Sequence, residues 1–383
     1  MVSPASTEID VSVVVPTLNE AGNLATLIGR IDAELRGRPY EILLIDDSST
    51  DGTADLVRRL SAMNPVRLIE RESPTGGLSG AVILGLSEAR GQFLVVMDAD
   101  LQHPPEQIPD LLAPLESNEA EFVLGSRYVR GASTDGRWGA LRKLNSWAAT
   151  LLARPFAGRA RDPMSGFFAL RRQTFQRAKR LNPIGYKIAL ELMCKCQVAS
   201  VREVPIHFGL RTAGESKLNL SQQLRYLDHL SRLYDFCFPR GSAWVKFAIA
   251  TACAWLAAFS VYVRLVAHDV SPVLAPTLAF AGAGLTTAVF HLRALRRAGK
   301  PLASRRDWID FALVTIGEWS ICTLAARWLG THIEHLTVLQ FFAVVFSAVA
   351  AARLALRTRM LHSLQGVRLA QSAPPARTIR EAA

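Results

Sequence analysis

The stretch that decides the fold is residues 93–105, FLVVMDADLQHPP. It opens with an apolar run that contains branched side chains, a pattern typical of a strand buried on both faces of a sheet. The run ends in two carboxylates, Asp98 and Asp100, which therefore lie at the carboxyl end of the strand. Open α/β sheets bind their ligands at that end, so the stretch predicts both a fold class and the place of its site.

A divalent metal site is the first function that this stretch predicts. Asp98, Asp100 and the side-chain amide oxygen of Gln102 are hard oxygen ligands of the kind that Mg²⁺ or Mn²⁺ prefers beside a diphosphate. The alternative is a polar loop that only closes the strand. Paired carboxylates at a buried strand end cost desolvation free energy unless a cation is present, which favours the metal site. His103 follows the motif, and we expect it to orient the loop rather than bind the metal.

The composition indicates a soluble domain followed by a membrane-bound part. Half of the 383 residues are hydrophobic and the net charge is +11. Long apolar segments recur from about Trp244 onward with Lys and Arg concentrated beside them, which favours an anionic membrane surface over nucleic acid as the partner. Residues 1–10 lack a basic stretch followed by an apolar one, so we expect no cleaved signal and a cytoplasmic first domain. The five cysteines show no CxxC spacing, and we expect them to be reduced.

The region before Trp244 alternates strand patterns with helix patterns. Apolar strand patterns occupy residues 11–15, 41–45, 66–70, 93–97 and 121–124. This rhythm predicts a mostly parallel α/β sheet with right-handed crossovers. At the end of the second strand, Asp47 is either a hydrogen-bonding partner of a nucleotide base or ribose, or a turn former. Asp51 is better explained as a helix N-cap.

Several motifs, in a fixed order, resemble those of a known family. They are PTLNE at residues 16–20, DDSSTDGT at 46–53, DADLQHPP at 98–105, GSRY at 125–128, DPMSGFFALRR at 162–172, GYK at 185–187, EVPI at 203–206 and SKL at 216–218. Over roughly residues 10–220 the chain is similar to family 2 glycosyltransferases of the dolichol-phosphate mannose synthase type. The resemblance implies a GT-A fold, which is Rossmann-like with a mostly parallel sheet.

The resemblance also implies roles for individual residues. It implies a metal site at Asp98, Asp100 and Gln102, with Asp98, Asp100 and Arg127 as catalytic residues. The residues that would bind the nucleotide sugar are Pro16, Glu20, Ile45, Asp47, Ala99, Arg211 and Lys217. Those that would face the lipid phosphate are Arg127, Arg142 and Ser146. There are two departures from the family pattern, because Leu18 stands where an aromatic residue is common and Ser79 interrupts a glycine-rich stretch.

The chemistry of sugar transfer fits these residue types. A carboxylate-held divalent ion and basic side chains neutralise a leaving diphosphate. A phosphate monoester acceptor is already an anion near neutral pH and needs no general base, but it needs arginine, whose planar fork pairs with phosphate oxygens. Basic residues crowd one loop and the start of the helix after it: Arg127, Arg130, Arg137, Arg142 and Lys143. They form either a binding site for the lipid phosphate or a solvated basic surface. Lys187 and Glu191 either face the substrate or lie on an exposed surface.

The second half of the chain predicts an interfacial helix and a transmembrane bundle. Leucines form one helical stripe within residues 221–240, which suits a helix in the membrane interface or a packing helix of the soluble domain. Apolar spans are expected near residues 244–266, 273–292, 308–329 and 336–356. Arginine-rich segments at 291–306 and in the tail place both termini and the catalytic domain in the cytoplasm. In hydropathy and layout this half is similar to the GtrA family.

These observations together predict four parts and one reaction. The parts are a GT-A domain at residues 1–220, an interfacial helix and linker at 221–240, a four-span GtrA-like domain at 241–360 and a disordered cytoplasmic tail at 361–383. The expected reaction is inverting transfer of a single hexose, mannose from GDP-mannose, to a polyprenyl phosphate (dolichyl or undecaprenyl) at the cytoplasmic face of the cell membrane, with Mg²⁺ or Mn²⁺. A UDP-sugar donor is the alternative within enzymes. A lipid-linked sugar flippase or scaffold with an inactive transferase domain is the alternative from another class.

Overall fold

The computed structural model describes residues 9–73, 75–134, 140–158, 160–182, 184–185, 187–209 and 220–270, together with scattered positions between 274 and 324. Within these ranges, the side chains of residues 140–148 and 220–222 and of some positions in the last helix are not described. The chain divides into two compact units, Met1–Leu233 and Tyr234–Ala383.

The first unit is built on a seven-stranded sheet with the order β3-β2-β1-β4-β7-β5-β8. The strands are β1 (Val11–Thr17), β2 (Tyr40–Asp46), β3 (Val66–Glu70), β4 (Phe93–Val96), β5 (Phe122–Ser126), β7 (Phe168–Arg171) and β8 (Val201–Pro205). All neighbouring pairs are parallel except those that β7 makes with β4 and β5. The predicted mostly parallel, Rossmann-like sheet is confirmed, with the antiparallel strand β7 inserted between β4 and β5.

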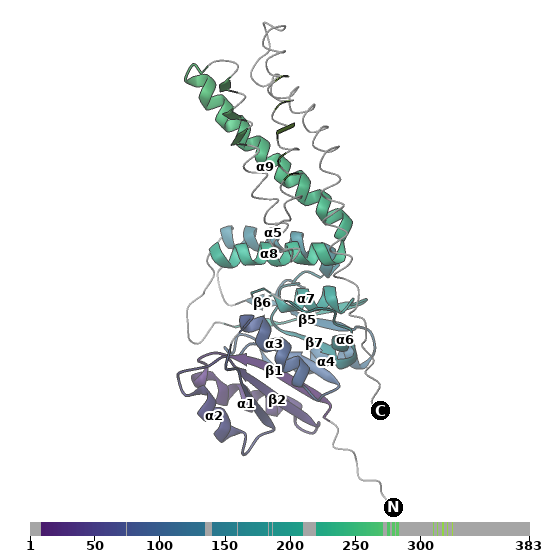
Figure 1. The fold of residues 1–383 in the computed structure, drawn as a ribbon. Helices are drawn as coiled ribbons and strands as arrows, with labels where there is room; N and C mark the ends of the chain where they lie inside the picture. The colour runs from purple at the N-terminus through teal and green to yellow at the C-terminus, as the bar shows by residue number, and fades with distance from the viewer. Residues whose placement is uncertain are drawn as a thin grey trace, which may run out of the picture. The chain divides into compact units, whose positions relative to one another are not determined.

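Helices cover both faces of this sheet (Figure 1). The helices that begin in this unit are α1 (Ala21–Leu35), α2 (Thr53–Leu60), α3 (Gly77–Glu88), α4 (Ile108–Glu116), α5 (Ala140–Ala157), α6 (Arg172–Gln176), α7 (Ile188–Lys195) and α8 (Leu220–Cys237), with a 3-10 turn η1 (Pro105–Gln107) before α4. A small second sheet pairs β6 (Ser133–Thr134) with β9 (His207–Phe208).

Alternate residues of β1 show how the layers form. Val11, Val13 and Val15 belong to one fully buried cluster with the apolar stripe of α1 and the leucines of α4. Val14 points to the other face, where a Cβ built on Gly85 of α3 would lie 2.4 Å from its Cγ1. The strand is therefore buried on both faces, as its continuous apolar sequence predicts.

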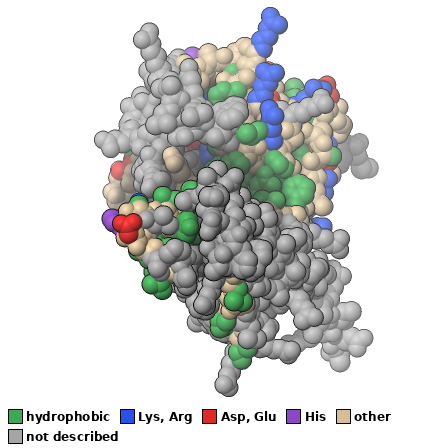
Figure 2. All heavy atoms as spheres, turned by 90° about the horizontal axis from the view of Figure 1, so that it is seen from above, with side chains coloured by type: hydrophobic (Ala, Val, Ile, Leu, Met, Phe, Trp, Pro, Cys, Tyr) green, Lys and Arg blue, Asp and Glu red, His purple; other side chains and the backbone are tan. Residues whose placement is uncertain are grey.

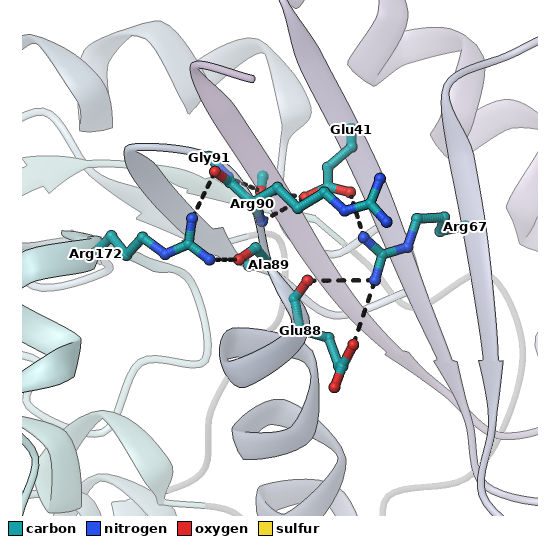
Figure 3. A network of polar contacts seen from close by, with 8 residues as sticks. Glu41, Arg67, Glu88, Ala89, Arg90, Gly91 and Arg172 are labelled. Atoms are coloured by element: carbon teal, nitrogen blue, oxygen red, sulfur yellow. Dashed lines mark hydrogen bonds and ion pairs between the residues drawn. The ribbon is translucent and has the colours of Figure 1, made fainter. Parts of the chain in front are cut away.

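A polar network joins the strands at the amino edge of the sheet (Figure 3). Its centre is Glu41, which is 4% exposed. One carboxylate oxygen accepts hydrogen bonds from Ser12 Oγ (2.7 Å) and from the backbone N–H of Arg90 (2.7 Å), and the other accepts from Arg67 Nη1 (3.0 Å). Arg172 donates to the carbonyl oxygen of Arg90 (2.7 Å), and Arg90 lies in the loop before β4. This buried carboxylate is thus well supplied with donors, as buried charges must be.

The second unit contains α9 (Pro239–Ala267), which covers the first predicted apolar span. Large apolar side chains are exposed along it, namely Val245, Ile249, Leu256, Val261 and Val263. Hydrophobic side chains are also visible between the grey atoms in Figure 2. Near its start, Asp235 accepts hydrogen bonds from Ser242 Oγ and Lys246 Nζ, both at 2.7 Å.

The membrane half of the sequence prediction is not confirmed. Among the residues that the structure describes, no helix combines the length and the apolar character needed to cross a bilayer. The second and third predicted spans are described only at scattered positions, and the fourth span and the predicted tail lie outside the described residues. The expectation of reduced cysteines is wrong for Cys194 and Cys237, which are disulfide-bonded, whereas Cys196 and Cys253 are free.

Candidate active site

The predicted metal loop lies where β4 ends, at the carboxyl edge of the parallel strands. The backbone N–H of Asp98 donates to His103 Nδ1 (3.0 Å), and the N–H of Gln102 donates to Asp100 Oδ1 (3.2 Å). Leu101 between them has a φ of 61°, so the loop turns sharply through the left-handed region. Ala99 and Asp100 are buried, while the Asp98 side chain is 37% exposed. The loop therefore presents one accessible carboxylate beside a second one that is fixed in place.

His103 orients this loop, as the sequence predicts. Its ring is 3% exposed, stacks on Phe167 at 5.3 Å between centroids and meets the edge of Phe208 at 5.6 Å. Burial lowers the pKa of His103, and the nearby carboxylates of Asp98 and Asp100 only partly oppose this. The imidazole is therefore neutral near pH 7, which suits an Nδ1 atom that accepts a hydrogen bond from Asp98.

Gly166 is a residue of this site to which the sequence patterns assigned no role. A Cβ at this position would lie 3.2 Å from both Asp98 Oδ2 and His103 Cε1. A side chain here would crowd the metal loop, so glycine suits the close approach of the chain after α5. The motif at residues 162–172 contained the signal, since a glycine inside a motif often marks a close backbone approach.

The donor atoms at this loop fit a divalent cation that also binds a diphosphate. Asp98 and Asp100 supply carboxylate oxygens, which suit Mg²⁺ and Mn²⁺. Gln102 is tied to the residue that follows β9, because its Nε2 donates to the Gly209 carbonyl (3.1 Å) and its own carbonyl accepts from Gly209 N–H (3.1 Å). No cluster of three or more His, Cys, Asp or Glu that could hold a metal occurs among the described residues.

The predicted nucleoside residues gather at the ends of β1 and β2. Pro16 and Ile45 are paired in the strand register, and both are buried. Ile45 faces the core, where its side chain approaches Gly85, so only its backbone is available to a ligand. Asn23 Nδ2 donates to Glu20 Oε2 at 2.7 Å. Leu18 is 48% exposed beside them, at the position where the family commonly has an aromatic residue.

Asp47 is joined to a partner that the sequence patterns do not indicate. Arg71 Nη1 donates to Asp47 Oδ1 at 2.5 Å, and both side chains are nearly buried. Arg71 also donates to the carbonyl oxygens of Thr75 and Gly77 and so fixes the turn before α3. Burial raises the pKa of Asp47, although the charge of Arg71 opposes the shift. Asp51 receives hydrogen bonds from the N–H groups of Thr53 and Ala21 (3.0 Å each) and therefore supports the starts of two helices.

Arg127 follows β5 and lies against Asp162. The carboxylate of Asp162 accepts from Arg127 Nε (2.7 Å), Nη2 (2.8 Å) and the backbone N–H (3.1 Å). Burial works to lower the pKa of Arg127, but the hydrogen bonds and charge of Asp162 outweigh it and raise the pKa. The guanidinium is therefore charged and held in a fixed orientation.

The other predicted phosphate contacts are described only in part. Arg142 and Ser146 belong to α5, but their side chains are not described. Arg211 and Lys217 lie outside the described residues. The structure therefore brings together Asp98, Asp100 and Gln102 in one loop, and Pro16, Ile45 and Asp47 at the neighbouring strand ends. The roles assigned to all of these residues stay predictions.

Lys187 and Glu191 differ in their surroundings. Burial and the charge of Arg127 lower the pKa of Lys187 to about 8, although Asp162 and Asp98 oppose the shift. Glu191, in contrast, is 1% exposed and accepts from Lys195 Nζ (2.6 Å), His229 Nε2 (2.7 Å) and Asn182 N–H (2.7 Å). Glu191 is thus a buried link between α7 and α8, so the predicted surface position is wrong, whereas a sugar contact stays a prediction.

Ser79 explains one departure from the family pattern. Its hydroxyl is fully buried and donates to the carbonyl oxygen of Gly185 at 2.7 Å. Gly80 beside it is required, because a Cβ there would lie 2.3 Å from the Thr75 carbonyl oxygen. The start of α3 is therefore tied to the loop that carries Lys187.

Residues 12–178 match the family model described as glycosyl transferase family 2. A solved structure of glucosyl-3-phosphoglycerate synthase from Mycobacterium tuberculosis, in complex with Mn²⁺, UDP-glucose and phosphoglyceric acid, is 22% identical. That match covers 60% of this chain and 80% of that chain, with a TM-score of 0.45.

Three curated relatives are much more similar, and each carries the name dolichol-phosphate mannosyltransferase. The relative from Pyrococcus furiosus is 46% identical over 58% of this chain and 63% of its own length. The relative from Mycosarcoma maydis is 44% identical over 59% of this chain and 80% of its own length. The relative from Saccharomyces cerevisiae is 41% identical over 60% of this chain and 89% of its own length. The chain is therefore a glycosyltransferase that belongs to family 2, among the relatives of the dolichol-phosphate mannosyltransferases.

Proposed function

We propose that this protein transfers a single mannose from GDP-mannose to a polyprenyl phosphate, with inversion at the anomeric carbon. The observation that carries the proposal is the site itself, in which Asp98 and Asp100 lie in one loop and Arg127 is linked to that loop through packed aromatic rings. The names of relatives at 41–46% identity support mannose as the sugar and a polyprenyl phosphate as the acceptor. An inactive scaffold would have no need to keep these charged groups in place.

A divalent ion, Mg²⁺ or Mn²⁺, would be held by Asp98, Asp100 and Gln102 and would neutralise charge on the leaving diphosphate. An oxygen of the lipid phosphate attacks C1 of the sugar, the bond from C1 to the diphosphate oxygen breaks, and GDP leaves with the electron pair. The acceptor oxygen carries no proton to remove, so no general base is required. The cationic side chains of Arg127 and Lys187 stabilise the phosphate charges on either side of the reacting carbon.

The nucleoside would bind at the ends of β1 and β2, with Pro16, Glu20, Ile45 and Asp47 around it. We further propose that Ala99, Arg211 and Lys217 reach the donor and that Arg142 and Ser146 join Arg127 at the lipid phosphate. The register that pairs Pro16 with Ile45, and the position of Asp47 directly after β2, support the nucleoside assignment.

We propose that the reaction takes place at the cytoplasmic face of the cell membrane, with the second unit as a multi-pass, GtrA-like anchor. Two leucines of α8, Leu224 and Leu227, are 59% and 50% exposed, as expected of a helix that lies in a membrane interface. The arginine-rich segment at residues 291–306 supports cytoplasmic termini by the positive-inside rule.

A donor panel tests the proposed function. Membranes containing the protein are given polyprenyl phosphate, Mg²⁺ or Mn²⁺, and labelled GDP-mannose, UDP-glucose or other UDP-sugars. Organic-extractable label from GDP-mannose alone, abolished by a chelator, is the expected result. Label from a UDP-sugar only would replace the donor assignment, and no transfer from any donor at any metal concentration would reject the enzymatic proposal.

A further inference from the structure

We infer that Asp162 is a positioning residue, which holds the guanidinium of Arg127 in the orientation needed to meet the acceptor phosphate. This inference rests on the proposed function. Asp162 is 1% exposed and accepts three hydrogen bonds from Arg127, at Nε, Nη2 and the backbone N–H. The carboxylate therefore fixes the end of β5 and the arginine side chain at the same time.

Asp162 itself is held from behind by β8. Glu203 accepts from the backbone N–H of Asp162 through Oε1 and from that of Arg161 through Oε2, both at 2.8 Å. The Asp162 carbonyl oxygen accepts from Ser165 N–H at 3.2 Å, which closes the turn toward Gly166. The orientation of Arg127 is thus set by a chain of contacts that starts in the sheet, and a rigid support of this kind preorganises a binding group.

The other face of the guanidinium is packed against aromatic rings. Arg127 Cζ lies 5.2 Å from the Phe208 centroid and 5.5 Å from the Tyr128 centroid. Phe208 in turn meets the ring of His103, whose Nδ1 accepts from Asp98 N–H. Asp162 and Phe208 therefore fix Arg127 in a defined position relative to the metal loop. The donor diphosphate and the lipid phosphate would meet at that loop.

Asp162 pairs with one particular edge of the arginine. It uses the side-on edge formed by Nε and Nη2, which fixes the plane of the guanidinium. Lysine has no such edge and could not be held by Asp162 and bind a phosphate in the same way. Asp162 therefore affects the acceptor step through Arg127 and not through contact with the substrate.

A double-mutant cycle tests this inference. The variants are Asp162→Asn, Arg127→Ala, both together, and Glu106→Gln as the matched control, since Glu106 forms a two-pronged pair with Arg30 (2.7 and 2.6 Å) to which no role in the reaction is assigned. Mannosyl transfer is measured against polyprenyl phosphate, and GDP binding is measured by calorimetry. Asp162→Asn is expected to lower kcat/KM for the lipid phosphate about 10- to 100-fold while the Kd for GDP is unchanged.

The decisive result is the double variant. If Asp162 acts through Arg127, adding Asp162→Asn to Arg127→Ala changes the transfer rate by less than about twofold, because the partner is already gone. Losses that multiply, or a weakened Kd for GDP in Asp162→Asn, would overturn the inference. Glu106→Gln is expected to transfer at the wild-type rate.

A second variant covers the case in which Asp162→Asn fails to fold. Arg127→Lys keeps the charge but cannot form the side-on pair, so its kcat/KM for the lipid phosphate is expected to fall nearly as far as that of Arg127→Ala. A loss below about threefold would overturn the positioning role. Absence of transfer by the wild-type protein would instead reject the proposed function, which separates the two failures.

Discussion

The two edges of the large sheet both hold carboxylates beside arginines, yet they use them differently. At the amino edge, Glu41 accepts from Ser12, from Arg67 and from the backbone of Arg90, and its side chain is 5% exposed. At the carboxyl edge, Asp98 keeps 37% of its side chain exposed next to the buried Asp100. The first carboxylate is enclosed by the protein's own donors, whereas the second remains accessible to a ligand.

Burial and the number of protein donors distinguish a carboxylate that stabilises the fold from one that can bind a ligand. A buried carboxylate with several protein donors contributes to folding, and removing its charge leaves donors unpaired. An accessible carboxylate held by backbone contacts contributes little to folding but can bind a cation. We therefore expect substitutions at the amino edge to change stability and substitutions at the carboxyl edge to change activity.

The largest effect is expected for Asp100→Ala at the carboxyl edge. Loss of a metal ligand should lower mannosyl transfer about 10³-fold, because the leaving diphosphate is no longer neutralised. For the accessible neighbour Asp98, whose side chain is 37% exposed, the free energy of unfolding of Asp98→Ala, measured in urea, should change by less than about 1 kcal/mol. A variant that retains a tenth of the wild-type rate at saturating Mn²⁺ would contradict the assigned role.

The counterpart at the amino edge is Glu41→Gln. The amide presents N–H donors toward Arg67, so we expect a loss of about 1.5–3 kcal/mol in the free energy of unfolding. The transfer rate per folded molecule should be unchanged. Denaturant titration measures the first quantity, and a kcat lowered more than threefold in the folded fraction would remove the distinction between the edges.

The next smaller effect concerns pH and Lys187. Burial, followed by the charge of Arg127, lowers the pKa of this amine from 10.5 to about 8 in the folded protein. Between pH 8 and 10.5 the unfolded chain binds the extra proton, so stability rises with pH in that window, by about 1–3 kcal/mol. Lys187→Met should lose this rise, as unfolding curves at pH 8 and pH 10 would show. An unchanged slope in the variant would mean that another group titrates there.

The smallest effect is expected at an exposed pair of similar chemistry. Arg30 and Glu106 form two short hydrogen bonds, but their side chains are 35% and 46% exposed. Water screens such a pair, so Glu106→Gln should cost at most about 0.5–1 kcal/mol. A larger loss by thermal unfolding would show that exposure does not separate the weak pairs from the strong ones in this protein.

Much of the first unit follows from its sequence because its signals are local. The apolar runs that give β1 to β5, and the carboxylates directly after them, are enough to place the metal loop and Asp47 at one edge of the sheet. β7 was missed, since FALR is short and takes its place between β4 and β5 only through distant pairing. Propensity and periodicity carry no information about such a partner.

The roles of Asp162, Arg71 and Glu191 were missed for a related reason. Each is defined by a partner far away in the chain: Asp162 by Arg127, Arg71 by Asp47, and Glu191 by His229. A carboxylate on a helix looks exposed from sequence unless the helix that covers it is known, as Glu191 demonstrates. The motif at residues 162–172 begins with Asp162, but the sequence does not indicate that this residue holds Arg127.

One measurement tests the central claim most directly. Single-turnover transfer from labelled GDP-mannose to polyprenyl phosphate is compared for the wild-type protein, Asp100→Ala and Glu41→Gln, each normalised to its folded fraction. We expect Glu41→Gln to match the wild type and Asp100→Ala to form almost no mannosyl lipid. Equal rates for all three, or a loss confined to Glu41→Gln, would contradict a catalytic site at the carboxyl edge of the sheet.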